Sequence, residues 1–582
     1  MQFLKTHWFA VCLGLVIAAA AFLRLYKLDA LPPSLYWEEA ALGYDAYSIL
    51  KTGRDHHGQP WPVVAFTSFG DYKPSGYFYA IVPFIAAFGL NEWAVRLPSA
   101  LAGVGSVIGV GLLARMLAVK VWPEYTPEYR RRLQIIASAM AAVSPWLLQF
   151  SRGGWEVNLA ASLLLWSVIS TLHARTTTRP FPFRLLGVAL ASAAMYTYHA
   201  TRAIAPMVLL FLFAWEAWEV LTEKKKLSLA LHLQHLPPII LAGISFLALA
   251  SPILLQSSSS TTQQRFAETS ITADGTYVKE SNALREAALS SPLTQLFTHR
   301  YVMLGREVAT NFFTHFRPDF LFITGDANHR HSVQFFGLLY PFDAVFLVLG
   351  SGVLAHAALK RRTAMASILF LSFWLMIGVL PAALTKATPH ALRILPTAPI
   401  FFFVLAIGVN QLYTLLQQLR LPRSIRGVYP QLVVGILIST VALQFFAYWR
   451  YYTRIYPALA SQDWQYGYKK MVAAVEKYND GQTPLFITRE YGRPAMYYWF
   501  YTQTDPREVQ AEQDTAAKDQ QEFLSFQNIT FINTVNEVKP GIIASSPEGF
   551  EQLTSQFSSS ERLSEIRDLR GQVVWVIVRV QE

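Results

Sequence analysis

The chain has 582 residues, of which 53% are hydrophobic and only 15% charged, and this apolar content exceeds what the cores of soluble domains require. In a soluble protein, the formal net charge of +11 would suggest a nucleic-acid partner. The excess is unevenly placed, because from Arg450 onward 14 Lys and Arg face 17 Asp and Glu. We therefore predict an integral membrane protein whose basic residues lie in loops, with no nucleic-acid partner.

Long apolar runs predict a polytopic, mainly α-helical protein, because a membrane-crossing helix needs about 20 apolar residues. About eleven spans are expected. They cover residues 8–24, 96–118, 133–150, 155–174, 183–201, 203–221, 236–255, 339–359, 364–384, 394–415 and 428–448. The first run has no small-residue cleavage site after it, so we interpret it as a retained span. It contains the only cysteine, Cys12, so no disulfide within the chain and no cysteine-based metal site is expected.

Basic loop clusters predict the orientation, since Lys and Arg in short loops favour the cytoplasmic side. The clusters follow alternate spans, and they are Arg130 to Arg132, Arg175 with Arg179, Lys224 to Lys226, Lys360 to Arg362, and Arg420 with Arg423 and Arg426. We expect a multi-pass protein of the cell membrane with a cytoplasmic N-terminus. The predicted outer segments are 24–95, 150–155, 199–203, 256–338, 385–393 and everything after 448.

The apolar stretch 76–90 tests this orientation, because counting it as a span would place every basic cluster outside. At about 15 residues it is short for a span and suits an interfacial or re-entrant helix.

The segment 449–582 has short apolar runs that predict a small extracytoplasmic α/β domain, separate from a membrane domain at 1–448. The expected strands are 485–488, 529–533, 541–544 and 573–580, and the expected helices are 463–478, 507–524 and 547–556. The polar stretch 257–264 is of low complexity and predicts an irregular part of the outer loop.

Two adjacent acids, Glu38 and Glu39, follow the first span beside aromatic residues. Neighbours on a helix point about 100° apart, so only one of them can face a given substrate. One of the two acids is therefore a candidate general base. The alternative is that these acids stabilise the N-terminus of a helix. Farther on, Asp71 and Lys73 precede a helix-starting proline, where the lysine could hold a phosphate or extend to the membrane interface.

Further cations lie in predicted outer loops, against the positive-inside bias. They are Arg152, His199, Arg202, His390 and Arg393. The last four form two pairs spaced by three residues, which places each pair on one face of a helical end, suited to an anionic headgroup. Interfacial anchoring is the alternative for any one of them.

The long outer loop adds polar residues that could contact a substrate or a metal. His315, Asp319 and Asp326 are its candidates, with His331 nearby, and a divalent cation is left open because their spacing matches no closed metal motif. No other cofactor is indicated. Tyr44 and Tyr72 suit packing against a sugar ring or an aromatic belt.

An ordered set of motifs resembles bacterial members of glycosyltransferase family 39, which are related to protein O-mannosyltransferases and to the lipid A aminoarabinose transferase. The matching segments lie within about the first 400 residues. They are YWEEAALGYDAYSILKTGRD (36–55), SFGDYKPSGYFY (68–79), RLPSALAG (96–103), FSRGGWEVNLA (150–160), YTYHATR (196–202), FFTHFRPDFLFITGD (312–326) and PHALR (389–393).

This resemblance implies a membrane enzyme of the GT-C type that takes a sugar from a polyprenyl phosphate and passes it, with inversion, to a hydroxyl acceptor outside the cytoplasm. The acceptor is a protein, a lipid or a glycan. In the family, the first acid of an Asp-Glu pair is the base, and Glu38 stands at that position here. A positioned carboxylate can accept the hydroxyl proton, while cations stabilise the departing phosphate, with Lys73, Arg202, His390 and Arg393 as candidates.

Two alternatives come from other classes of protein. A transporter or flippase for a lipid-linked or anionic substrate would fit the number of spans, but transporters place ionisable residues at the bilayer midplane, whereas these gather at one face. A non-catalytic scaffold would leave Glu38, Glu39 and Asp71 freely replaceable.

Overall fold

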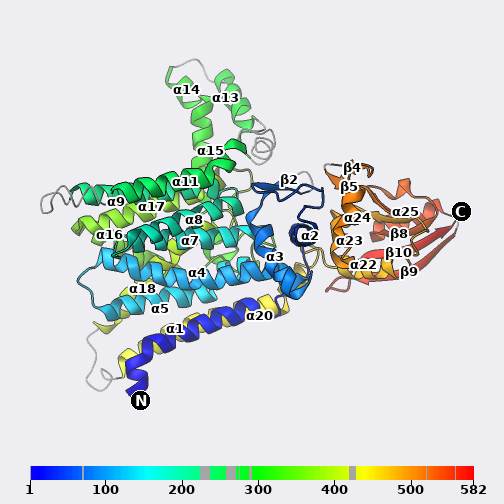
Figure 1. The fold of residues 1–582 in the computed structure, drawn as a ribbon. Coiled ribbons are helices and arrows are strands. Elements are labelled where there is room, and N and C mark those ends of the chain that lie inside the picture. Colours follow the sequence, from blue (N-terminus) through cyan, green and yellow to red (C-terminus); the bar gives the residue numbers. More distant parts are fainter. Residues whose placement is uncertain are drawn as a thin grey trace. The chain divides into compact units, whose positions relative to one another are not determined.

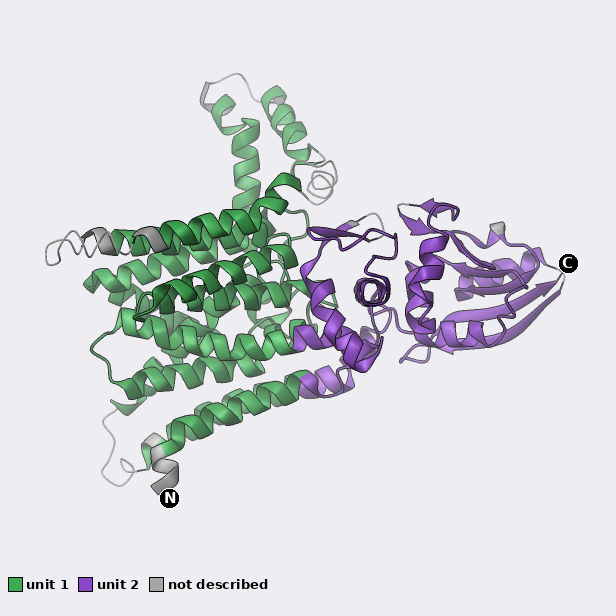
Figure 2. Ribbon diagram, in the orientation of Figure 1, with its two compact units in different colours: residues 1–24, 101–151, 156–448 green, residues 25–100, 152–155, 449–582 purple. Residues whose placement is uncertain are grey.

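The computed structural model describes residues 2–68, 71–222, 236–256, 270–273, 275–287, 292–418, 428–519, 521–557 and 559–581. The predicted basic clusters at 224–226 and 420–426 and the polar stretch 257–264 lie outside these ranges. The chain divides into two compact units (Figure 2). Unit 1 comprises residues 1–24, 101–151 and 156–448, and unit 2 comprises residues 25–100, 152–155 and 449–582.

Unit 1 is a bundle of long helices (Figure 1). Its helices are α1 (Gln2–Leu25), α4 (Glu92–Val121), α5 (Pro127–Val143), α6 (Pro145–Ser151), α7 (Glu156–Ala174), α8 (Pro180–Thr197), α9 (Thr201–Thr222), α11 (Leu236–Gln256), α16 (Asp343–Lys360), α17 (Arg362–Ala383), η3 (Leu395–Thr397), α18 (Ala398–Gln417) and α20 (Tyr429–Arg454). Among the described residues, nine helices are long and apolar enough to cross a membrane, or ten if the bent pair α5 and α6 forms one span. The protein is therefore a multi-pass membrane protein.

The predicted number of about eleven spans exceeds this count because of α8. A helix does form there, but it contains Arg184, which is fully buried in an ion pair with Glu216 of α9. The bend between α5 and α6 measures 60° and falls at Ser144. Ser144 has an extended backbone because it precedes Pro145, and a proline disfavours the helical conformation of the residue before it.

Close helix contacts hold the bundle together. A Cβ on Gly350 of α16 would lie 2.1 Å from the carbonyl oxygen of Val404, and one on Gly408 of α18 would lie 1.9 Å from that of Phe346. Only glycine permits this approach of α16 and α18, as is common where membrane helices pack backbone to backbone.

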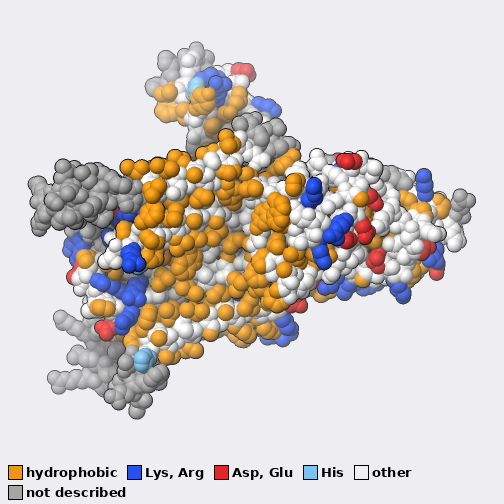
Figure 3. Space-filling view, viewed as in Figure 1, with side chains coloured by type: hydrophobic (Ala, Val, Ile, Leu, Met, Phe, Trp, Pro, Cys, Tyr) orange, Lys and Arg blue, Asp and Glu red, His pale blue; other side chains and the backbone are white. Residues whose placement is uncertain are grey.

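Basic loops meet at one end of the bundle. Arg361 pairs with Glu124, which joins the α16–α17 turn to the α4–α5 loop, and Glu219 of α9 pairs with both Lys120 and Arg175. Figure 3 shows Lys and Arg gathered at this end and hydrophobic side chains over the flank of the helices. Within the described residues, Arg361 and Arg175, which belong to two of the predicted basic clusters, therefore lie at the same end of the bundle.

The long loop between α11 and α16 contains α13 (Thr276–Ala287), α14 (Pro292–Phe297) and α15 (Arg300–Thr314), which project from the bundle (Figure 1). A short π-helix, η2 (Asp319–Ile323), follows α15. The Asn311 amide near the end of α15 donates to the carbonyl of Ala383, which fixes this end of the loop against α17.

Unit 2 begins with α2 (Trp37–Thr52), the hairpin of β1 (Ala65–Ser68) and β2 (Asp71–Pro74), and α3 (Gly76–Phe88). A short apolar helix does form in the stretch 76–90: α3 has 13 residues and is too short to be counted among the spans, while its interfacial or re-entrant position stays a prediction. α3 packs against α2.

The rest of unit 2 is a six-stranded sheet with helices. Its order is β6-β7-β3-β8-β10-β9, with β3 parallel to β7 and β8 and with β10 antiparallel to β8 and β9. The main strands are β3 (Leu485–Thr488), β6 (Ser525–Phe526), β7 (Ile529–Ile532), β8 (Gly541–Ser545), β9 (Ser559–Arg567) and β10 (Val573–Gln581). The helices are α21 (Tyr456–Leu459), α22 (Tyr468–Glu476), α23 (Pro494–Thr502), α24 (Pro506–Ala511), η4 (Val535–Glu537) and α25 (Pro547–Gln556).

All four predicted strands of this region are confirmed. The predicted helix 507–524 is wrong over most of its length, because α24 ends at Ala511 and two short paired strands follow, β4 (Lys518–Asp519) and β5 (Glu522–Phe523). Phe523 of β5 is buried, and Glu522 pairs with Arg489, so tertiary contacts override the local helical preference.

Candidate active site

The two acids of the first outer segment form the first turn of α2, and their side chains enter different surroundings. Tyr36 is the N-cap residue, and its backbone N–H donates to Oε2 of Glu39 at 3.2 Å. Adjacent residues on a helix diverge by about 100°, so Glu38 points elsewhere.

Glu39 is fully buried and saturated with hydrogen bonds. Its Oε1 accepts from Nε of Arg96 at 2.8 Å and from the backbone N–H of Gly154 at 2.7 Å, and its Oε2 accepts from Nη2 of Arg96 at 3.0 Å. A Cβ on Gly154 would lie 3.2 Å from Cγ of Glu39, so the glycine allows the backbone to come this close. These contacts anchor the start of α2.

Glu38 is partly open to solvent, with 34% of its side chain exposed. Its Oε2 lies 3.0 Å from Nζ of Lys73 and accepts a hydrogen bond from the Tyr36 hydroxyl at 2.9 Å. Glu38 is therefore a partly exposed carboxylate that pairs with the buried ammonium group of Lys73.

The β1–β2 hairpin places Lys73. Lys73 lies opposite Phe66 in the antiparallel register, and Phe66 stacks on Phe78 of α3 at 4.1 Å between ring centroids. Asp71 lies opposite Ser68 in the same hairpin, but its side chain is outside the described part of the structure. Tyr72 is partly exposed.

Aromatic rings surround the start of α2. The Tyr36 ring lies 5.1 Å from that of Trp155 and 5.7 Å from that of Trp464, and the Arg96 guanidinium lies 5.8 Å from the Trp464 ring. The rings cover the Glu39–Arg96 pair and exclude water from it, whereas the Glu38 side chain stays partly exposed to solvent.

Two predicted site residues have structural contacts instead. Arg152 is fully buried, donates to the carbonyl oxygens of Tyr26 and Leu31, and packs against aromatic rings. It is therefore not placed to clamp a phosphate. Tyr44 is buried, and its hydroxyl donates to the carbonyl of Thr504, so its predicted contact with a sugar or an acceptor is replaced by packing inside unit 2.

Gln465 is a positioning residue that the sequence did not reveal. Its Oε1 accepts from the backbone N–H of Trp37 at 2.8 Å and from the Tyr497 hydroxyl at 2.7 Å, and its Nε2 donates to the carbonyl of Tyr491 at 2.9 Å. Trp37 directly precedes Glu38, so the C-terminal region holds the turn of α2 that carries the candidate base. No sequence signal could have found this contact, because 428 positions separate the two residues.

Buried titratable groups lie near the C-terminal end of α2. Asp45 Oδ1 lies 2.6 Å from Nδ1 of His56, and the centroids of the His56 and His57 rings are 3.9 Å apart with 40° between the planes. Burial raises the pKa of Asp45 to about 7. Burial lowers the pKa of His57 to about 3, and its Nδ1 lies 3.1 Å from Oε1 of Gln513. His57 is therefore neutral at neutral pH.

In unit 1, the predicted cations occupy two turns. His199 lies between α8 and α9, and Arg202 lies in the first turn of α9. The Arg202 N–H donates to the His199 carbonyl, and both side chains are partly exposed. Arg393 lies in the loop after α17 and donates to Thr385 and to the carbonyl of Ala387. The predicted contact of these cations with an anionic headgroup stays a prediction.

The predicted residues of the long outer loop separate. His315 is the residue that follows α15; it is buried, and its Nδ1 lies within hydrogen-bond distance of the carbonyl of Asn311. Asp319 is exposed, and its carboxylate pairs with Arg317 at 2.8 Å. Burial lowers the pKa of His315.

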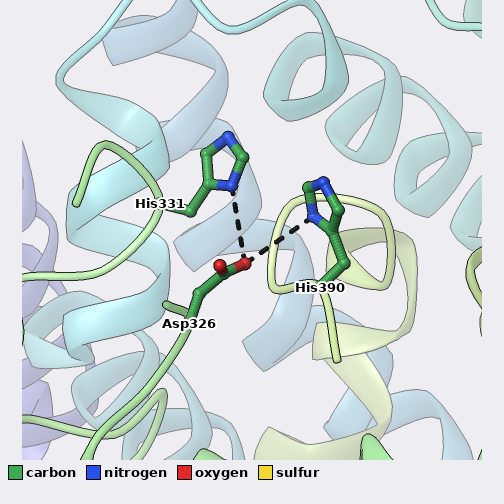
Figure 4. A group of neighbouring side chains, drawn as sticks. All are labelled: Asp326, His331 and His390. Atoms are coloured by element: carbon green, nitrogen blue, oxygen red, sulfur yellow. Dashed lines mark ion pairs between the residues drawn. The ribbon is translucent and has the colours of Figure 1, made fainter. Parts of the chain in front are cut away.

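Asp326 meets His331 and His390, and these three side chains are the described residues that could hold a metal ion (Figure 4). Burial opposes ionisation of Asp326, but the neighbouring His331 and His390 keep its pKa below the ordinary value. Burial lowers the pKa of His390.

Comparisons with known proteins give the fold. No protein-family model matches the chain, and no curated protein matches it. Solved structures do match: this is a multi-pass membrane protein with the GT-C fold.

Two crystal structures of ArnT from Cupriavidus metallidurans carry this finding. The one bound to undecaprenyl phosphate is 14% identical, covers 97% of each chain and has a TM-score of 0.53. The apo structure is 12% identical, covers 98% of each chain and has a TM-score of 0.50. The archaeal oligosaccharyltransferase AglB from Archaeoglobus fulgidus has a TM-score of 0.48 at 13% identity, over 98% of this chain and 74% of that chain.

Proposed function

We propose that this protein is a glycosyltransferase that moves a sugar from a polyprenyl-phosphate donor to a hydroxyl group of an acceptor outside the cytoplasm. The observation that carries the proposal is the Glu38–Lys73 pair, in which a reachable carboxylate lies 3.0 Å from a cation. Support also comes from the GT-C fold, which the chain shares with ArnT bound to undecaprenyl phosphate, and from the ordered motifs at 36–55 and 68–79.

Glu38 is the proposed general base. A hydroxyl group is a weak nucleophile until a positioned carboxylate accepts its proton as the new bond forms. The acceptor oxygen attacks the anomeric carbon, the bond from that carbon to the phosphate oxygen breaks on the opposite face, and the configuration inverts. Glu39 does not serve this step, because Arg96 and Gly154 already occupy both of its oxygens.

Lys73 is the proposed phosphate ligand. The leaving group is already a stable phosphate, so the site has to supply positive charge rather than a proton. Before the donor binds, the ammonium group of Lys73 pairs with the carboxylate of Glu38. Asp71, Tyr72, His199, Arg202 and Arg393 stay predictions as further site residues.

The proposed location is the cell membrane, with the N-terminus in the cytoplasm and Glu38 outside. The convergence of basic loops at one end of unit 1 supports this orientation. The donor's hydrocarbon tail would lie in the bilayer.

The test is donor specificity. Purified protein in proteoliposomes is given either an undecaprenyl-phosphate-linked sugar or the same sugar as a nucleotide donor, together with delipidated envelope material as acceptor. We expect undecaprenyl phosphate to be released, with the sugar joined to a hydroxyl group. For a Glu38→Gln variant in the same assay, Glu92→Gln is the matched control. Glu92 also lies in unit 2 but pairs with the exposed Lys469. Transfer from the nucleotide donor alone, or transport of intact lipid-linked sugar without cleavage, would contradict the proposal.

A further inference from the structure

We propose that Asp326, His331 and His390 form a binding site for one divalent cation of the Zn²⁺ type. The site would join two segments of unit 1, namely the loop after η2 and the loop after α17. It is independent of the proposed function, because it rests on donor atoms alone.

The donor atoms converge on one point. Nδ1 of His331 lies 3.4 Å from Oδ2 of Asp326, and Nδ1 of His390 lies 3.7 Å from the same oxygen. Figure 4 shows both ring nitrogens pointing at this carboxylate oxygen. With bonds of about 2.0–2.1 Å and a tetrahedral angle, two ligands of one zinc ion are separated by roughly 3.3–3.4 Å. These two spacings are close to the edge of such a tetrahedron, and all three ligand atoms lie within 4.8 Å of one another.

The two rings are held next to each other without a geometry that satisfies both. Their centroids are 4.7 Å apart with 31° between the planes, and within the described structure Nδ1 of His390 is buried without a hydrogen-bond partner. A buried polar atom without a partner costs free energy. A cation bound to both Nδ1 atoms would remove this cost, and it would explain why the two imidazoles lie next to each other.

The carboxylate is fixed by backbone groups, as metal ligands in proteins usually are. Oδ1 of Asp326 accepts from the Asn328 N–H at 2.9 Å, and Oδ2 accepts from the Ala391 N–H at 2.7 Å. Nε2 of Gln334 also donates to the Asp326 carbonyl at 2.9 Å. Oδ2 keeps a second lone pair, which can bind the cation.

The donor set selects the kind of ion. Two imidazoles and one carboxylate suit Zn²⁺ or a similar transition metal rather than Mg²⁺ or Ca²⁺, which prefer oxygen ligands. Three protein ligands leave a fourth position for water or an anion. Arg393 follows His390 by three residues, so a bound ion would also fix the loop that carries this cation.

The test is metal content of the full-length protein in detergent. The chain is stripped with a chelator, incubated with Zn²⁺ or Co²⁺, passed through a desalting column and assayed for bound metal. We expect one ion per chain, a tetrahedral Co²⁺ absorption spectrum, and a fall in Tm when the chelator is added again. His390→Gln and Asp326→Asn should lose all three signals. His329→Gln is the matched control, because this exposed histidine of the same loop lies outside the triad.

If His390→Gln fails to fold, His331→Gln serves as the second variant. Retention of one ion per chain by a folded triad variant would overturn the proposal. So would background metal content in the wild-type protein after loading, which would leave an Asp326–His331 ion pair as the explanation of this cluster.

Discussion

Arg96 holds Glu39 by two hydrogen bonds in a fully buried ion pair, 57 positions apart in the chain. Glu38, the next residue to Glu39, is 34% exposed in its side chain and pairs with Lys73. One dipeptide therefore contains a buried acid that anchors the helix and a partly exposed acid that we propose as the general base.

Breaking the anchor should destabilise the protein. Replacing one partner of a buried ion pair leaves the other charge uncompensated and costs about 3–5 kcal/mol. We expect Arg96→Gln to lower Tm markedly, as followed by intrinsic fluorescence in detergent. Lys469→Gln is the control, because its pair with Glu92 is exposed and surface pairs contribute little. Equal Tm values for the two variants would contradict the role given to Arg96.

Removing the Lys73 charge should weaken use of the donor. A hydrogen bond to a charged group contributes about 1.5–3 kcal/mol, so Lys73→Gln should lower kcat/KM by roughly 10- to 100-fold. Inorganic phosphate should also inhibit the wild-type protein better than the variant. Unchanged inhibition by phosphate would show that Lys73 does not bind the leaving group.

Gln465→Ala should impair turnover without affecting donor binding. The variant removes the acceptor for the Trp37 N–H and so loosens the turn that carries Glu38. We expect kcat to fall while KM for the donor stays the same, and Gln465→Glu to recover part of kcat because it keeps the acceptor oxygen. Gln462→Ala is the control, since Gln462 is exposed and contacts Gln572. A change in KM alone would argue against positioning.

His57 should make the protein sensitive to acid. Its folded pKa of about 3 is below the ordinary 6.5, so the unfolded chain binds the proton more readily. The stability that the buried, neutral His57 contributes is complete above pH 6.5 and is lost progressively as the pH falls toward 3. We expect the Tm difference between wild type and His57→Gln to shrink from pH 7 to pH 4. The comparison reduces the opposite effect of Asp45, whose pKa burial raises in both proteins. A constant difference would contradict the burial of a neutral His57.

The spans and the short helix at 76–88 could be predicted because apolar length is a local property of the sequence. The strands of the C-terminal region could be predicted for the same reason, since short runs of apolar and β-branched residues are visible in short windows. The helix predicted at 507–524 was wrong because the burial of Phe523 and the Glu522–Arg489 pair depend on distant residues.

The candidate site could be predicted only in part. The motifs placed Glu38 and Lys73 in outer segments, but they could not show that Arg152 is buried or that Asp326 meets His390 across 64 positions. Contacts of this kind are made by folding, and a single sequence carries no signal for them.

The most direct test compares Glu38→Gln with Glu39→Gln in one preparation, measuring both Tm and the rate of sugar transfer from an undecaprenyl-phosphate donor. We predict that Glu38→Gln keeps the wild-type Tm and loses kcat by roughly 100- to 10,000-fold, as expected for removal of a general base. Glu39→Gln should lower Tm, because it breaks the pair with Arg96. Full turnover by a folded Glu38→Gln variant would contradict the proposed mechanism.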